Sequence, residues 1–147
     1  MRFICDEMLA GFARWLRAAG HDAALGLPGQ PDGELVRRAE AEDRVLLTKD
    51  RKMLERRTSA RVLLLAGDDD VMAATLRTEF GLDWLAAPFT RCLVDNTALR
   101  PAPPERAVEA PSPGPVNLCP ACGRLYWPGS HVRRMGERLA VWAGQGR

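Results

Sequence analysis

Short apolar runs alternate with segments of helical spacing along the first 85 residues, and this alternation limits the fold more than any other feature. Each run is flanked by charged residues or glycine, as expected for strands that are buried on both faces. Strands that alternate with helices predict right-handed crossovers and a mainly parallel sheet between two helical layers. The expected fold class is therefore α/β. The four runs lie at residues 2–5, 23–27, 44–48 and 61–66.

The segments between these runs have the spacing of amphipathic helices. In the first, Gly20 marks the end of an apolar stripe that consists of Leu9, Phe12, Ala13 and Leu16. The helix over 71–80 is similarly ended by Gly81. A second helix is expected to begin at Asp32, and a short third helix is expected to cover residues 53–57.

The composition changes in the second part of the chain. Residues 101–116 contain six of the 11 prolines, so we predict an extended, poorly ordered connector without a helix or a central strand. Residues 91–147 carry eight arginines against four acidic residues, which makes this part basic. We therefore predict a domain at 1–88 and a smaller module at 89–147 that includes the connector.

Length and composition argue against several classes of protein. The 147 residues, 46% of them hydrophobic, suffice for one core with a small appendage. No apolar run approaches the roughly 20 residues that span a bilayer, and two acids at positions 6 and 7 interrupt any signal-peptide core. A cytoplasmic protein with reduced cysteines and no membrane partner is expected.

Acidic residues follow three of the predicted strands at the points where the strands end. Asp6 and Glu7 follow the first run, Asp50 follows the run at 44–48, and three aspartates at 68–70 follow the last. Parallel strands end at one edge of the sheet, where ligands of open α/β sheets bind. Carboxylates that converge there repel one another unless a cation offsets their charge, and Mg²⁺ or Mn²⁺ suits oxygen ligands.

The same acids allow a simpler interpretation. Each precedes a predicted helix, and aspartate is a favoured N-cap that stabilises a helix by about 1 kcal/mol. Asp32 and Glu34 begin the second predicted helix, where they are either a cap and a first-turn acid or further members of the acidic edge. A metal site and a set of helix caps are therefore both compatible with the sequence.

Basic residues accompany the acids. Arg14 and Arg17 lie three positions apart on the first predicted helix, and Arg51 follows Asp50. A solvated helix face would explain the first two. A nuclease also needs this combination, because metal ions offset the charge of the scissile phosphate while arginines hold the flanking backbone.

Three of the four cysteines lie in the second part of the chain. Cys119 and Cys122 form a CxxC pair, and Cys92 and Asp95 have the same spacing with a carboxylate in place of the second thiolate. Paired knuckles of this kind are typical of zinc sites, and zinc accepts carboxylate oxygen. These four residues are the candidate zinc ligands, with His131 as an alternative fourth, and a ribbon that folds without metal is the other interpretation.

Taken together, the motifs resemble a known family. Residues 6–9, 16–22 and 44–51 are similar to the compact PIN-like ribonucleases. Residues 91–96 and 119–127 are similar to the zinc ribbon of one branch, the prokaryotic "Mut-seven C-terminal" RNase-domain family. The resemblance implies a PIN-like three-layer fold, a C-terminal zinc-ribbon-like module, and a divalent-metal-dependent endoribonuclease activity on RNA.

The resemblance also implies roles for individual residues. Asp95 stands where the family has a cysteine, so the fourth zinc ligand departs from the pattern. The implied catalytic carboxylates are Asp6 and Asp50 as the principal metal ligands, Asp32 or Glu34 as a further acid, and Asp69 as a peripheral one.

Two other functions are compatible with the residues. A receiver-like phospho-acceptor domain would hold Mg²⁺ near Asp6 and accept a phosphoryl group on Asp50. However, no strand after Asp50 ends in the lysine that would hold the phosphoryl group. A non-catalytic nucleic-acid-binding module would use the acids only as caps, each stabilising by about 0.5–2 kcal/mol. A metal-dependent ribonuclease, with Arg14, Arg17 and Arg51 placing the RNA strand, is the function that we predict.

Overall fold

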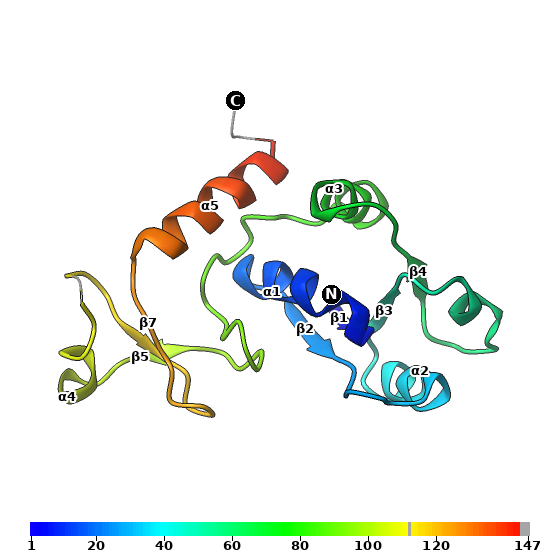
Figure 1. Ribbon diagram of the computed structural model, residues 1–147, viewed down its shortest axis with the longest axis horizontal. Coiled ribbons are helices and arrows are strands. Elements are labelled where there is room, and N and C mark those ends of the chain that lie inside the picture. The colour runs from blue at the N-terminus through cyan, green and yellow to red at the C-terminus, as the bar shows by residue number, and fades with distance from the viewer. Residues whose placement is uncertain (112, 145–147) are drawn as a thin grey trace.

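A computed structural model describes residues 1–111 and 113–144, and its main sheet confirms the predicted α/β class (Figure 1). All neighbouring strands of this sheet run parallel, and Ile4 at its centre pairs with Ala24 on one side and Leu46 on the other. The strand order is β2-β1-β3-β4. The strands are β1 (Arg2–Cys5), β2 (Asp22–Leu25), β3 (Val45–Thr48) and β4 (Val62–Leu64).

Helices cover both faces of this sheet, which gives the predicted three layers. Helices α1 (Ala10–Ala18) and α3 (Asp69–Phe80) pack against the face that carries Phe3 and Cys5. Helix α2 (Asp32–Ala41) and the 3₁₀ turn η2 (Arg51–Glu55) pack against the face that carries Ile4 and Leu46. Another 3₁₀ turn, η1 (Glu7–Leu9), joins β1 to α1. As predicted, α3 ends at Gly81, whose φ of 62° lies in the left-handed region that glycine adopts readily.

The prediction for the proline-rich connector was wrong in one respect. A single helical turn, α4 (Pro104–Ala107), lies within 101–116. Pro103 is its N-cap and Pro104 its first residue, where the fixed φ of proline suits a helix and the missing N–H is no loss. Prolines therefore start a short helix here instead of preventing one.

The second part of the chain forms a small antiparallel sheet and a long helix. Strands β5 (Arg100–Pro101), β6 (Asn117–Leu118) and β7 (Leu125–Tyr126) pair in that order. Pro101 lies on an edge strand, the place in a sheet where proline is tolerated. Helix α5 (Ser130–Trp142), which the sequence analysis did not predict, follows this sheet.

Helix α5 packs back onto the α/β layers. Met135, Leu139 and Trp142 are buried in the same core cluster as Phe12 and Trp84. The Trp142 indole Nε1 also donates to Asp70 Oδ1 at 2.8 Å. One core thus continues across the predicted boundary at 88/89, and the division into a domain and a module stays a prediction. Within the described ranges, no helix combines the length and apolar character needed to cross a bilayer.

Candidate active site and metal centre

As the sequence predicted, Asp6 and Asp50 lie at the carboxyl ends of two strands, β1 and β3, which the structure shows to be neighbours in the sheet. The ladder between these strands extends one step beyond β1, because the N–H of Asp6 donates to Leu47 O at 3.0 Å. Thr48 connects the two acids: its Oγ1 donates to Asp6 Oδ2 at 3.1 Å and accepts the N–H of Asp50 at 3.0 Å. Thr48 is fully buried, so this shared hydroxyl fixes both residues at the sheet edge.

Each carboxylate of this pair keeps one oxygen available. Asp50 Oδ1 accepts the N–H of Lys52 at 2.9 Å and so caps the turn η2. Asp6 Oδ2 is used by Thr48, whereas Asp6 Oδ1 and Asp50 Oδ2 accept no hydrogen bond from the residues that the structure describes. Helix capping and metal binding are therefore compatible at Asp50, because the two roles use different oxygens.

The other predicted acids lie in the first turns of helices. Asp32 and Glu34 begin α2, and Asp69 begins α3 next to its N-cap Asp68, whose Oδ1 accepts the N–H of Val71 at 3.0 Å. Across residues 1–111 and 113–144, these acids form no group of three or more whose ligand atoms lie within reach of a common ion. The structure thus shows a carboxylate pair at the sheet edge and further acids in the first turns of α2 and α3, not one five-membered cluster.

Of the three predicted RNA-binding arginines, Arg14 and Arg51 are exposed and Arg17 is buried. The Arg17 guanidinium donates to Ala23 O at 2.8 Å, Leu93 O at 3.0 Å and Val94 O at 3.1 Å. Burial lowers the pKa of this guanidinium from its usual value. Because its donors are directed at backbone carbonyls, Arg17 holds the loop that follows Cys92 against the α/β layers and does not face an RNA strand.

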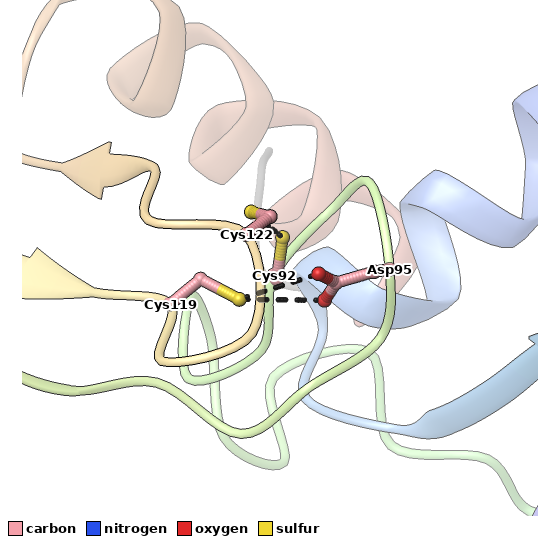
Figure 2. A group of neighbouring side chains, drawn as sticks. All are labelled: Cys92, Asp95, Cys119 and Cys122. Atoms are coloured by element: carbon pink, nitrogen blue, oxygen red, sulfur yellow. Dashed lines mark hydrogen bonds between the residues drawn. The ribbon is translucent and has the colours of Figure 1, made fainter.

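The four predicted zinc ligands converge (Figure 2). The ligand atoms of Cys92, Asp95, Cys119 and Cys122 all lie within 4.8 Å of one another. The sulfurs of Cys92 and Cys122 are 3.8 Å apart, and the Cys119 sulfur lies 3.4 Å from each Asp95 oxygen. In a tetrahedral site with zinc–sulfur distances of about 2.3 Å, sulfurs lie about 3.8 Å apart and sulfur and oxygen about 3.5 Å apart. The cluster can therefore hold a metal such as zinc.

Local backbone structure brings these ligands together. Cys119 follows β6 directly, and the N–H of Gly123 donates back to Cys119 O at 2.8 Å to close the knuckle. The φ of Gly123 is 78°, which glycine adopts without the strain that a side chain would add. His131, the alternative fourth ligand, lies exposed in the first turn of α5 and does not belong to the cluster.

The charges in the cluster favour a cation. Burial opposes ionisation of Asp95, but hydrogen bonds from Thr97, Cys92 and Cys119 outweigh it and lower the pKa of the carboxyl to about 2. At the exposed Cys122 a hydrogen bond from the Arg124 N–H favours the thiolate, yet partial desolvation and hydrogen bonds with Cys119 and Cys92 raise the pKa to about 11. Thiols this close together deprotonate when a metal ion supplies the compensating charge.

Two residues of these sites escaped the sequence analysis. Thr48 is a polar, β-branched residue at the end of an apolar strand, and this position in the sequence could have indicated that its hydroxyl contacts the acids at the sheet edge. Tyr126 lies next to Cys92, with its hydroxyl 3.0 Å from the sulfur, and it accepts the N–H of Leu93 at 3.1 Å. Nothing in the spacing of Tyr126 indicates this contact, because it joins residues more than 30 positions apart.

Comparison with known proteins supports the resemblance seen in the motifs. Neither the curated proteins nor the solved structures that were compared with the chain gave a match. A family model described as the Mut7-C RNAse domain matches residues 1–139, which include both the carboxylate pair and the cysteine cluster. The chain therefore belongs to the Mut7-C RNAse domain family, a membership that implies a ribonuclease-type function with RNA as the substrate.

Proposed function

We propose that this protein is a divalent-metal-dependent endoribonuclease that hydrolyses RNA phosphodiester bonds beside Asp6 and Asp50. The observation that carries the proposal is the carboxylate pair held by Thr48, with one free oxygen on each acid, at the sheet edge where ligands of such folds bind. Family membership supplies the substrate class.

The pair fits Mg²⁺ or Mn²⁺. Magnesium is commonly held by only one or two carboxylates and keeps several waters, so a third protein ligand is not required. When bound, such an ion offsets charge on the scissile phosphate and lowers the pKa of a water molecule. Asp6 and Asp50 would provide its protein ligands, Arg14 and Arg51 would hold the flanking phosphates, and Asp32, Glu34 and Asp69 would orient waters around the pair.

We expect the protein to cut RNA with Mn²⁺ or Mg²⁺ and to be inactive in EDTA. The measurement is the cleavage of labelled single-stranded and structured RNAs, together with a circular RNA that only an endonuclease can open. Opening of the circle in the presence of either ion supports an endonuclease. A folded protein that leaves all three RNAs intact with both ions would contradict the proposal and favour a non-catalytic RNA-binding module.

We further propose that the cysteine cluster holds structural zinc. Soft thiolates select zinc over harder ions, and a carboxylate as fourth ligand weakens the site relative to four thiolates. We expect Asp95→Cys to retain zinc at a chelator concentration that strips the wild type, and Asp95→Ala to lose zinc first. The metal content of the three proteins after a chelator titration is the measurement. Equal zinc retention by all three would exclude Asp95 as a ligand.

A further inference from the structure

Three adjoining hollows surround Trp127 on the second part of the chain. They measure about 280, 220 and 500 Å³, and Tyr126 and Trp127 line all three. Arg14 and Arg124 border the largest, and His131 borders this hollow and the one of 280 Å³. We call these three hollows and their lining residues the Trp127 surface.

The Trp127 surface is cationic and aromatic. Within 1–111 and 113–144, no Asp or Glu lines any of the three hollows, and neither Arg14 nor Arg124 forms an ion pair. Both guanidiniums are also exposed. Two free arginines beside apolar hollows without a neighbouring carboxylate favour a ligand that combines negative charge with a flat apolar face.

Trp127 differs from the two tryptophans of the core. The indole N–H groups of Trp84 and Trp142 donate to protein oxygens at 3.1 and 2.8 Å. Trp127 is half-buried, and its indole N–H has no acceptor among the residues that the structure describes. A β-carbon at Gly129 would lie 3.0 Å from Trp127 Nε1, so the glycine leaves the edge of this indole open. The ring thus offers both an apolar face and an unused donor.

The residue next to Trp127 is held rigidly by the cysteine cluster. The Tyr126 hydroxyl lies 3.0 Å from Cys92 Sγ and accepts the N–H of Leu93, while its backbone pairs with Asn117 in the small sheet. Trp127 follows directly after this strand. A platform that is ordered before binding does not lose conformational entropy when a ligand stacks on it.

We propose that the Trp127 surface binds single-stranded RNA, with a nucleobase stacked on Trp127 and the neighbouring phosphates held by Arg14 and Arg124. Stacking on aromatic side chains beside a basic groove is how proteins bind unpaired strands, and paired bases in a duplex do not offer their faces. The choice of RNA over other nucleic acids rests on the proposed function. The placement of Trp127, Arg14 and Arg124 on one surface does not depend on the proposed function.

The position of Arg14 connects this surface to the carboxylate pair. Arg14 lies on α1, the helix that follows Asp6 through the turn η1. Arg14 is eight positions after Asp6, with the three residues of η1 and the first turn of α1 between them, and a rise of 1.5–2.0 Å per residue corresponds to about 12–16 Å. A strand that stacks on Trp127 and passes Arg14 would therefore reach the sheet edge within a few nucleotides, and the surface would select unpaired substrate for cleavage.

The test measures binding without turnover. A fluorescein-labelled 12-nucleotide single strand, a duplex of the same sequence and an abasic strand of the same length are titrated with the wild type, Trp127→Ala and Trp127→Phe, without added Mg²⁺ or Mn²⁺ and without a chelator, so that the cysteine cluster keeps its metal. Single-strand binding should weaken about 5- to 150-fold in Trp127→Ala, which corresponds to the loss of one base–aromatic stack. Trp127→Phe should retain most of the affinity, and binding of the duplex and the abasic strand should not change.

Two further measurements distinguish the loss of base stacking from a loss of the fold. RNA should quench the intrinsic fluorescence of the wild type, and Trp127→Phe, which keeps an aromatic ring, should lose that quenching. Arg124→Gln should reduce the slope of log affinity against log salt by about one, whereas Arg57→Gln, an exposed arginine outside the surface, should leave it unchanged.

The proposal is overturned if a folded Trp127→Ala protein binds the single strand within twofold of the wild type, or loses duplex affinity equally. A surface built for a protein partner would give the first of these results and no quenching by RNA. Failure of the proposed ribonuclease function gives a different result from failure of RNA binding at Trp127. Trp127-dependent binding by a protein that cuts no RNA would support this inference alone, and cleavage with unchanged Trp127→Ala binding would support the nuclease alone.

Discussion

Replacing Asp50 with Asn is expected to lower the rate of RNA cleavage by about 10³-fold while the fold stays intact. The substitution removes the negative charge and the free oxygen that would hold the metal, and charge stabilisation by a catalytic metal accounts for several kcal/mol. The amide keeps an oxygen that can accept the Lys52 N–H, and asparagine is as good an N-cap as aspartate. Single-turnover cleavage in Mn²⁺, with circular dichroism of the same sample, measures both effects.

Asp6→Asn should lose activity to a similar extent, because Asp6 provides the other half of the pair. Asp68→Asn is the matched control: Asp68 also follows a strand of the main sheet, but its role is to cap α3. This control should cleave within twofold of the wild type. If all three variants were equally active, Asp6 and Asp50 would have only structural roles and the catalytic site would lie elsewhere.

Trp84→Ala is expected to lower the free energy of unfolding by about 3–5 kcal/mol. The Trp84 side chain is fully buried, and its ring lies edge-on to Phe12 and Trp142 at centroid distances of 5.9 and 5.0 Å. The substitution leaves a cavity between α1, α3 and α5, and it also removes the hydrogen bond from the indole to Ala73 O. Urea unfolding followed by circular dichroism measures the loss.

The control for this prediction is Val108→Ala, since Val108 is 81% exposed and should contribute less than about 0.5 kcal/mol. A loss below about 1 kcal/mol in Trp84→Ala would mean that the core relaxes around the missing ring. In that case α5 would not depend on Trp84 for its packing.

The main sheet and its acidic edge were predictable because they depend on local patterns. Each strand is an apolar run, and three of the four runs are followed by an acid, so the parallel arrangement brings Asp6 and Asp50 to one edge. The strand order was not predictable, since it depends on which helix covers which face. The convergence of Cys92, Asp95 and the CxxC pair was also predictable, because metal-binding knuckles have a fixed spacing.

Contacts between distant parts of the chain escaped prediction. The place of Arg17 on a helix predicts that it binds RNA, but its hydrogen-bond acceptors include two backbone carbonyls more than 70 positions away. No local pattern in the sequence indicates such distant partners. Trp84 lies in a stretch without periodicity, so its burial depends on α5 packing against it. Helix α5 did carry a signal: Met135, Leu139 and Trp142 have the spacing of one helix face.

The return of α5 to the core has a consequence for synthesis of the protein. Ribosomes add about 5–20 residues per second and release the chain from its N-terminal end. Phe12 and Trp84 leave the ribosome well before Leu139 and Trp142, which complete the cluster around them. During that interval α5 is not there to cover the aromatic side chains of the nascent α/β layers, so this core is completed only when the last helix has left the ribosome.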